Sequence, residues 1–480
     1  MARRFTARKQ AGPRKSTASR AAAPARTLAL AMLKEVRNPR GRGMDAVLEH
    51  ARRSGQIGAQ DVALAREIAY GVCRRRRWLE EILARYVHRP LPSGAVRVHE
   101  ALLCGIFQAI YLHRIPPHSI VDETVRLTGQ VRTEAGYRRL ANAVMRRIVE
   151  TPRAELLPGP DVSWPVRESM PDWLASEAGQ VLPTNELHQF FAALNEQAPL
   201  SLRITRPAAE SPEVPIEERL RGEVVDLTHA LPEIAPGRFL PECLHVRARG
   251  LSPEYLPLFQ RGFVTAEDEG AQFAGWLAGP RPGMSVLDLC ASPGGKTAHL
   301  LDLMDRRPAR FVATDVGEEK LDRLRETLDR LALRPLVETR EVSTLPEHYE
   351  PATFDLVLVD APCTGLGTLR RHPEIRWRRS PRQVRELAQT QAELLRQAAT
   401  WVRPGGTILY SVCTFTVLET DRVIDEFLHE NTPAFTPAEA PEALPFDTAP
   451  FSAGPGKWRT FTHRHACDTF YVAKLQRAQT

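Results

Sequence analysis

Two cysteines directly follow or nearly follow strand-like segments in the C-terminal half of the chain. Cys363 closes the run Asp360-Ala-Pro-Cys363, which leaves the apolar segment 354–360, and Cys413 directly follows the apolar segment 407–412. A lone cysteine is usually an inert, small apolar side chain. Two at the carboxyl ends of strands are different, because α/β proteins bind their ligands at that edge of the sheet. What these thiols could do depends on the ligand beside them.

A glycine turn predicts that ligand. Met284 to Leu289 reads as a central parallel strand, Pro293-Gly294-Gly295 forces a tight turn, and a helix is predicted from Lys296. Free N–H groups and a positive dipole end at such a turn favour an anionic or polar ligand. A dinucleotide would need G-x-G-x-x-G, which is absent. A phosphate loop would need glycine where Cys290 stands.

The third candidate is S-adenosylmethionine, whose amino-acid part lies over such a turn. An acid at the end of the next strand would then hold the ribose hydroxyls. Asp315 closes the apolar run 311–315, about 20 residues after the glycines, as that role requires. The spacing favours this methyl donor. Its predicted binding residues are Cys290, Ala291, Ser292, Pro293, Gly294, Gly295, Lys296 and Asp315.

A thiol beside a methyl donor suits methylation of carbon 5 of a pyrimidine. That carbon is too poor a nucleophile to attack a sulfonium methyl group directly. A thiolate that adds to carbon 6 makes carbon 5 enamine-like, so that it can attack. The carbon 5 proton must then leave and the thiol must be eliminated. The reaction therefore needs a nucleophile, a hydrogen-bonding group at ring nitrogen 3 and a base.

Composition and charge are those of a soluble globular protein of two or three domains, at 480 residues. No run approaches the roughly 18 apolar residues of a membrane span, so we expect a soluble, cytoplasmic monomer. The net charge of +7 suits a polyanionic partner, but also a solvated surface. Seven scattered cysteines without a C-x-x-C pair predict neither a metal site nor a disulfide framework.

Four regions follow from the pattern. Residues 1–25 are basic and lack acids, which predicts a disordered tail that touches RNA or is merely solvated; a transit peptide shares this composition. Residues 26–151 are helical, and residues 152–250 predict a small α+β connecting domain. The arginines of the helical region form either solvated faces or a phosphate-binding surface. They are Arg74–Arg77, Arg138, Arg139, Arg146 and Arg147.

Residues 251–480 alternate strands with helices. A helix is predicted over 384–401, ended by Pro404-Gly405-Gly406, and another from about Leu418 to Leu428. The fold class is therefore α/β: a doubly wound, Rossmann-like domain with ligands at the C-terminal strand ends, preceded by the all-α and α+β regions.

The helical region resembles the NusB family of RNA-binding domains. The resemblance is carried by Ala69-Tyr-Gly-Val-Cys73, Ala101-Leu-Leu-Cys-Gly-Ile-Phe-Gln-Ala-Ile-Tyr111, Ile115-Pro-Pro-His118 and Leu140-Ala-Asn-Ala-Val-Met-Arg-Arg147. It implies a region that binds RNA without catalysing a reaction.

The last region resembles the Sun/Nop family of RNA cytosine-C5 methyltransferases. Joined to the NusB-like region, it is similar to the RsmB/Sun type, which acts on 16S rRNA, over roughly 26–475. The most specific matches are Asp288-Leu-Cys-Ala-Ser-Pro-Gly-Gly-Lys-Thr297, Asp360-Ala-Pro-Cys-Thr-Gly-Leu-Gly-Thr-Leu-Arg-Arg-His-Pro-Glu-Ile-Arg-Trp377 and Tyr410-Ser-Val-Cys-Thr414.

This resemblance implies roles for the candidate residues. Cys413 matches the nucleophile and Cys363 the cysteine that assists product release. DNA cytosine methyltransferases attack instead with a Pro-Cys cysteine, which here would be Cys363. Either Cys413 or Cys363 could therefore be the nucleophile. Asp360 is implied to hold the cytosine at ring nitrogen 3, beside the methyl donor. Glu341 stands where an Asp usually contacts adenine, and residues 417–420 read Val-Leu-Glu-Thr instead of Pro-Glu-Glu-Asn.

The sequence thus predicts transfer of a methyl group from S-adenosylmethionine to carbon 5 of a cytosine in RNA, with 16S rRNA as the expected substrate. Two alternatives stay open: a ribosome-assembly scaffold of the same fold with little or no turnover, and a methyltransferase that acts on tRNA or DNA. Arg370, Arg371 and His372 either contact RNA phosphate or are plain surface.

Overall fold

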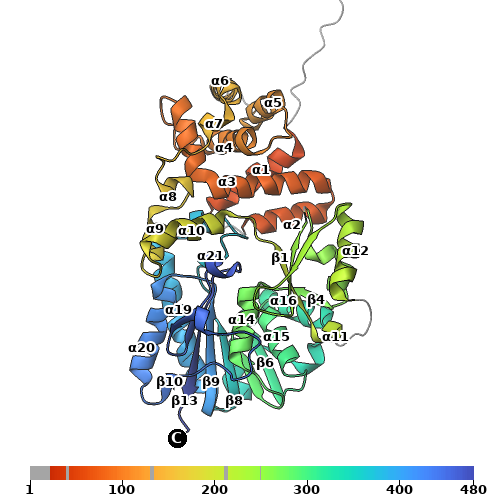
Figure 1. The fold of residues 1–480 in the computed structure, drawn as a ribbon, viewed down its shortest axis with the longest axis vertical. Coiled ribbons are helices and arrows are strands. Elements are labelled where there is room, and N and C mark those ends of the chain that lie inside the picture. Colours follow the sequence, from red (N-terminus) through yellow and green to blue (C-terminus); the bar gives the residue numbers. More distant parts are fainter. Residues whose placement is uncertain (1–21, 39–42, 130–134, 210–214, 249, 480) are drawn as a thin grey trace, which may run out of the picture. The chain divides into compact units, whose positions relative to one another are not determined.

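A computed structural model describes residues 22–38, 43–129, 135–209, 215–248 and 250–479 (Figure 1). Most of the tail predicted over residues 1–25 lies outside these ranges. The chain divides into two compact units, one ending at Gly159 and one beginning at Pro160, and the short link from Val36 groups with the second. Within the described ranges, no helix has the length and apolar character needed to cross a bilayer.

The first unit is helical, as its three-to-four-residue apolar repeat predicts. Helices α3 and α4 pack closely at Gly71, where an added Cβ would lie 2.0 Å from the ring of Phe107. The helices are α1 (Pro24–Val36), α2 (Met44–Ser54), α3 (Ala59–Tyr86), α4 (Val96–Tyr111), α5 (Pro117–Leu127), α6 (Ala135–Glu150) and α7 (Arg153–Leu156).

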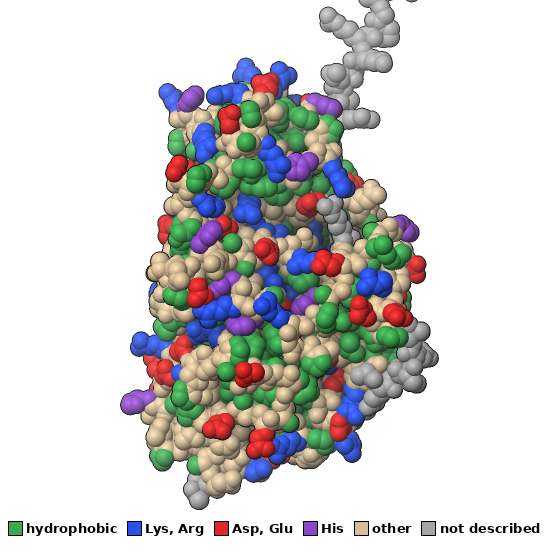
Figure 2. Space-filling model, in the orientation of Figure 1, with side chains coloured by type: hydrophobic (Ala, Val, Ile, Leu, Met, Phe, Trp, Pro, Cys, Tyr) green, Lys and Arg blue, Asp and Glu red, His purple; other side chains and the backbone are tan. Residues whose placement is uncertain are grey.

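One arginine of the predicted basic surface is a core residue. Arg76 is 6% exposed and donates to both carboxylate oxygens of Glu100, at 3.0 and 2.7 Å. Burial lowers the pKa of Arg76, but the Glu100 carboxylate outweighs it, so the pKa is raised. The prediction of a solvated or phosphate-binding face is therefore wrong for Arg76. Elsewhere, Lys and Arg side chains are spread over the visible surface (Figure 2).

The second unit begins with short helices and a small antiparallel sheet in the order β2-β3-β1-β4. Leu220 and Val224 of α12 pack against Leu202 and Val246 of that sheet. The elements are α8 (Trp164–Arg167), α9 (Asp172–Ala178), α10 (Thr184–Asn195), β1 (Leu200–Ile204), α11 (Arg206–Ala209), α12 (Ile216–Thr228), β2 (Glu233–Pro236), β3 (Cys243–Arg247), η2 (Pro253–Tyr255), α13 (Pro257–Gln260) and β4 (Val264–Ala266).

The large sheet has the order β11-β12-β13-β9-β8-β5-β6-β7, and β10 pairs with β13. Strands β9, β8, β5, β6 and β7 are parallel, whereas β13 runs antiparallel to β9. The strands are β5 (Ser285–Asp288), β6 (Arg310–Asp315), β7 (Glu338–Glu341), β8 (Phe354–Asp360), β9 (Val402–Val412), β10 (Phe435–Pro437), β11 (Ser452–Gly454), β12 (Lys457–Arg459) and β13 (Tyr471–Arg477).

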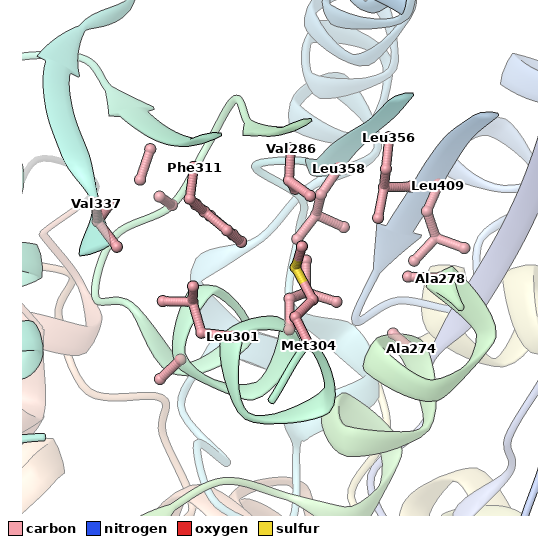
Figure 3. Packing of buried hydrophobic residues seen from close by; sticks show 14 of the residues in the cluster. Ala274, Ala278, Val286, Leu301, Met304, Phe311, Val337, Leu356, Leu358 and Leu409 are labelled. Carbon is pink, nitrogen blue, oxygen red and sulfur yellow. The ribbon is translucent and has the colours of Figure 1, made fainter. Parts of the chain in front are cut away.

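Helices cover both faces of this sheet, because successive strand residues point to opposite sides. On one face Val286, Phe311 and Leu358 pack against Ala274 and Leu301 (Figure 3). On the other face Leu287, Val357 and Ile408 pack against Leu395 and Phe427. The fold is therefore the predicted doubly wound α/β fold.

The main helices of this part of the chain are α14 (Glu269–Ala278), α15 (Gly295–Leu303), α16 (Glu318–Arg330), α19 (Pro381–Trp401) and α20 (Asp421–Asn431). Shorter helices are η3 (Arg334–Leu336), η4 (Val342–Thr344), α17 (Leu345–His348), η5 (Leu366–Thr368), α18 (Ile375–Arg378), η6 (Val417–Glu419), η7 (Ala449–Phe451) and α21 (Thr462–His465).

The segment Pro404-Gly405-Gly406 lies inside a strand instead of ending a helix. Helix α19 stops at Trp401, and β9 begins at the next residue. The pairing with β8 shifts between Val402 and Thr407, so the three residues form a bulge, in which Gly405 has φ of 72°. The helix predicted from Leu418 begins at Asp421.

Candidate active site

The two candidate cysteines meet at the carboxyl edge of the large sheet. Parallel strands β8 and β9 are neighbours, with Asp360 opposite Ser411, so the loops that leave them begin side by side. The Sγ atoms of Cys363 and Cys413 lie 3.4 Å apart, and both residues are half-buried. The sequence predicts only that the two cysteines share one edge of the sheet. The structure shows in addition that their sulfur atoms are in contact.

A glycine in the first loop allows the two loops to pack this closely. The N–H of Gly367 donates to the carbonyl of Cys413 at 2.9 Å, and the carbonyl of Gly367 accepts from Thr469 at 3.0 Å. A Cβ on Gly367 would lie 1.9 Å from the Thr469 carbonyl oxygen, so no other residue fits without moving the backbone.

The thiols lie among negative charges. Contact with Cys413 is the largest cause that raises the pKa of Cys363, followed by burial, and the nearby Glu419 carboxylate adds to the effect. Burial likewise raises the pKa of Cys290, with smaller contributions from Asp288, Asp315 and Asp360. Cys290 is therefore a neutral thiol in the turn.

Asp360 forms an ion pair with Lys296 of the glycine turn, at 2.8 Å. Burial lowers the pKa of Lys296, but Asp360 outweighs it and the pKa is raised. The sequence alone predicts Lys296 only as a member of the donor loop. The structure shows that it links the turn to the strand end that leads to Cys363.

The glycine turn is tied to the end of β6. The Ala291 N–H donates to the carbonyl of Thr314 at 2.8 Å, and the Ser292 N–H donates to the Asp315 carboxylate at 3.0 Å. The other Asp315 oxygen accepts from the Val316 N–H and from Lys320, at 2.7 and 2.8 Å. Asp315 therefore lies beside the turn, as predicted from its spacing.

Asp288 lies at the start of the turn and is almost fully buried. One of its oxygens accepts from the Thr297 hydroxyl at 2.7 Å, and the other has no partner among the described residues. Burial raises the pKa of Asp288 to about 7. Glu341 ends β7 directly opposite Asp315 and accepts a hydrogen bond from Ser343, which is the largest cause that lowers its pKa.

This turn fits S-adenosylmethionine better than a phosphate. Three acids, Asp288, Asp315 and Asp360, lie close enough to act on the Cys290 thiol. Lys320 and Lys296 pair with the last two, so these five side chains carry no excess of positive charge with which to hold a phosphate. Gly295 leaves room over the turn, since an added Cβ would meet only the Glu267 carboxyl group within 4 Å, at 3.8 Å.

The chain is similar to known methyltransferases over most of its length. The family model for 16S rRNA methyltransferase RsmB/F matches residues 275–476, and the NusB family model matches residues 23–150. Ribosomal RNA small subunit methyltransferase B of Pasteurella multocida is 32% identical over 430 residues, covering 88% of this chain and 90% of that protein. Its Yersinia pestis counterpart is 31% identical over 437 residues, covering 91% and 94%. The chain belongs to the 16S rRNA methyltransferase RsmB/F family.

Membership of the RsmB/F family confirms the prediction of an S-adenosylmethionine-dependent RNA methyltransferase with a NusB-like region. Solved structures agree on the fold. PH0851 has a TM-score of 0.74 at 24% identity and covers 95% of this chain and 99% of its own. NSun6 from Pyrococcus horikoshii with SFG has a TM-score of 0.54 at 18% identity, covering 65% and 99%.

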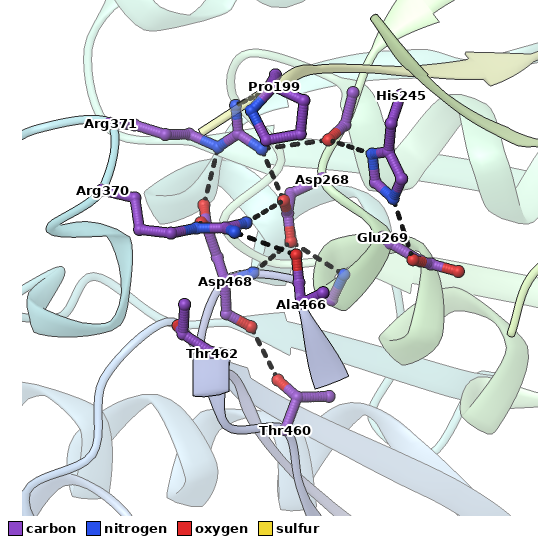
Figure 4. A network of polar contacts seen from close by, with 12 residues as sticks. Pro199, His245, Asp268, Glu269, Arg370, Arg371, Thr460, Thr462, Ala466 and Asp468 are labelled. Atoms are coloured by element: carbon purple, nitrogen blue, oxygen red, sulfur yellow. Dashed lines mark hydrogen bonds and ion pairs between the residues drawn. The ribbon is translucent and has the colours of Figure 1, made fainter. Parts of the chain in front are cut away.

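One of the two alternatives for Arg370 and Arg371, plain surface, is wrong in this RsmB/F member, because both arginines are held in an ion-pair cluster and Arg370 is buried. Both form ion pairs with Asp468, at 3.2 and 2.8 Å, and Arg371 also pairs with Asp268 at 2.6 Å (Figure 4). Arg371 further donates to the carbonyl of Pro199, at 2.8 Å. The arginines join the small sheet, the N-terminus of α14 and the C-terminal segment.

Sequence reasoning also missed Glu419, which lies beside the cysteine pair. In the sequence its segment, 417–420, stands out only as a departure from the family pattern. Its partners Thr414 and Thr416 are close in sequence, but Thr364 and Gln391 are 55 and 28 residues away. Only the folded sheet brings them together.

Proposed function

We propose that this RsmB/F-family enzyme methylates carbon 5 of a cytosine in RNA through a covalent bond to Cys413. The family model and the curated relatives carry 16S or small-subunit ribosomal RNA in their names, and we propose 16S rRNA as the substrate here. The observation that supports the chemistry is the pair of thiols, 3.4 Å apart, at the sheet edge that also carries the glycine turn.

Residues 290–296, Asp315 and Glu341 would hold S-adenosylmethionine, which supplies an electrophilic methyl group when bound. The Ser292–Asp315 hydrogen bond fixes the turn against the end of β6. Glu341 extends this acidic edge onto the next strand. Carboxylates at adjacent strand ends can accept hydrogen bonds from ribose hydroxyls.

Cys413 would act as the nucleophile. Its sulfur forms a bond to carbon 6 of the cytosine, and carbon 5 gains the electron density with which it accepts the methyl group. Ring nitrogen 3 takes up a proton as the thiol loses one. Asp360, held by Lys296 at 2.8 Å, accepts a hydrogen bond from that N–H and so steadies the ring.

Cys363 would assist release. Its raised pKa keeps it a thiol in the free enzyme, and it lies in contact with the sulfur of Cys413. After methylation a solvent water takes the carbon 5 proton, and the bond between carbon 6 and sulfur breaks with its electron pair left on the Cys413 sulfur. Cys363 can donate its proton to this departing thiolate, and the proton on ring nitrogen 3 then passes through Asp360 or solvent to the Cys363 thiolate, which restores both thiols and frees the product.

The test uses purified protein with a labelled methyl donor and, in separate reactions, 16S rRNA, tRNA and DNA. We expect label in 16S rRNA, recovered as 5-methylcytosine by nucleoside mass spectrometry, and complete loss of transfer in Cys413→Ala. Transfer that survives this substitution and depends on Cys363 would reverse the assigned roles. Stable RNA binding without label in any substrate would instead indicate a scaffold.

A further inference from the structure

Glu419, at the end of η6, is a fully buried carboxylate beside the two cysteines. Among the described residues it forms no ion pair with a Lys, Arg or His side chain, although an ionised carboxylate can only accept hydrogen bonds. Its oxygens are satisfied by neutral donors: the N–H and hydroxyl of Thr364 at 2.8 and 2.6 Å, the hydroxyls of Thr416 and Thr414 at 2.9 and 3.2 Å, and the Gln391 amide at 3.2 Å.

These donors hold both cysteine loops. Thr364 and Thr414 each directly follow one of the two cysteines, and their hydroxyl oxygens lie 2.9 Å apart. Gln391, besides donating to Glu419, donates to the carbonyl of Pro362 at 2.9 Å, on the other side of the first cysteine. One carboxylate therefore anchors the backbone on both sides of Cys363 and after the second cysteine.

A role in loop packing alone would not require a charge. Burying a carboxylate without a cation costs free energy that an uncharged side chain would not. The charge has an effect at the site, since Glu419 adds to the causes that raise the pKa of Cys363, after the larger effects of Cys413 and burial. The hydrogen bonds of Glu419 and its charge therefore both affect the same pair of thiols.

We infer that Glu419 is a positioning residue for methyl transfer, which acts through Thr364 and Thr414 to fix the geometry and charge environment of the two thiols. The inference rests on the function proposed for Cys413 and Cys363, and it adds a residue outside the reacting set. Glu419 itself contacts neither thiol through a hydrogen bond; its effect passes through the neighbouring threonines and through space.

The first test measures thiol reactivity without RNA or methyl donor. In Glu419→Gln the charge is lost, the size is kept, and the threonine hydroxyls can rotate to accept from the new amide. We expect the pH profile of Cys363 alkylation, followed by peptide mass spectrometry, to move to lower pH. Glu426→Gln, an exposed charge on the following helix, should leave the profile unchanged. An unmoved profile in folded Glu419→Gln protein overturns the inference.

The second test separates positioning from packing. Thr364→Val, Thr414→Val and Thr416→Val each remove one hydroxyl from the same carboxylate, but only the first two residues adjoin a cysteine. We expect kcat for methyl transfer to fall about 10- to 100-fold in the first two, with a smaller loss in the third and little change in KM for RNA. Thermal unfolding serves as the control. Equal losses that follow stability overturn the inference.

The two tests keep the inference distinct from the proposed function. Methyl transfer in Cys413→Ala decides whether the cysteine is the nucleophile. The alkylation profile decides whether Glu419 acts on the thiols, whatever reaction they perform. A shifted profile together with intact transfer in Cys413→Ala would retain Glu419 as a thiol-positioning residue and reject the catalytic assignment.

Discussion

Two polar clusters in the second unit contain buried carboxylates, and the partners of these carboxylates differ in kind. In the cluster of Arg370, Arg371, Asp268 and Asp468, two cations meet two carboxylates, and each side chain has a partner of opposite charge. In the cluster around Glu419, the donors to the carboxylate among the described residues are hydroxyls and amides. The charges of the arginines and aspartates in the first cluster balance one another. In the second cluster no positive side chain of the described residues balances the Glu419 carboxylate beside the thiols.

This difference separates residues that hold the fold together from residues that act on the thiols. The arginine cluster links distant segments, since Arg371 reaches the carbonyl of Pro199, 172 residues away. The Glu419 cluster links the loops that carry Cys363 and Cys413 to helix α19. We therefore expect substitutions in the first cluster to affect folding, and substitutions around the thiols to affect turnover.

The largest expected effect is on turnover, in Cys363→Ala. Without the thiol that assists release, the protein should remain joined to RNA after methylation, because the bond from Cys413 to carbon 6 no longer breaks efficiently. A band that contains both RNA and protein on a denaturing gel would show this. The unfolding temperature should stay near that of the unchanged protein.

The matched control is the double variant Cys363→Ala with Cys413→Ala, which should form no adduct. An adduct that persists in the double variant, or one that is absent from Cys363→Ala while turnover continues, would contradict the assignment of release to Cys363.

The next largest effect is on stability, in Asp468→Ala. Removing one carboxylate leaves Arg370 and Arg371 with an unbalanced buried charge, which should lower the free energy of unfolding by about 3–5 kcal/mol. Denaturant titration measures it. In Asp425→Ala the lost partner is the exposed end of an ion pair with Lys457, so the change should be at most about 1 kcal/mol. Equal losses in both variants would remove the distinction between the clusters.

Asp288 is a third case: among the described residues this buried acid forms no ion pair, and only one of its two oxygens accepts a hydrogen bond. Burial raises its pKa to about 7, so the folded protein holds a proton there that the unfolded chain releases at lower pH. Stability from this group is complete below the unfolded pKa and is lost as the pH rises through about 7. Its loss is about 1.4 kcal/mol for each unit of the shift.

Asp288→Asn should remove this dependence. Unfolding free energies measured by denaturant titration from pH 4 to pH 8 should fall more steeply with rising pH in the unchanged protein than in the variant. Parallel pH profiles for the two proteins would show that Asp288 titrates normally in the folded state.

The sequence was sufficient wherever a feature depends on local pattern. The run 354–360 matches β8 at both ends, and the glycine turn, Asp315 and the cysteines all lie at the strand ends where the alternation of strands and helices placed them. Fold class and cofactor followed from such patterns and from motif resemblance. The Pro404-Gly405-Gly406 segment misled, because a bulge within a strand and a helix stop use the same residues.

The remaining features depend on sheet order, which local patterns do not encode. That β8 and β9 are adjacent, and hence that the two thiols touch, follows from the strand order of the folded sheet. For the same reason the sequence does not show which arginines of a basic run are buried and which are exposed. Arg76 is buried because Glu100 comes from another helix, and Arg370 because Asp468 comes from the C-terminal segment.

The smallest expected effect concerns arginines that lack such partners. Arg139 and Arg146 of α6 are exposed and pair with no acid among the described residues, unlike Arg53 of α2, which pairs with Glu49 at 2.7 Å. If the first two contact RNA phosphates, replacing both with Ala should weaken RNA binding and reduce the slope of log affinity against log salt by roughly 1 for each lost contact. Filter binding from low to moderate salt measures the slope. Arg53→Ala should leave it unchanged, because its charge is already shared with Glu49; equal slopes for all three proteins would assign α6 to ordinary solvated surface.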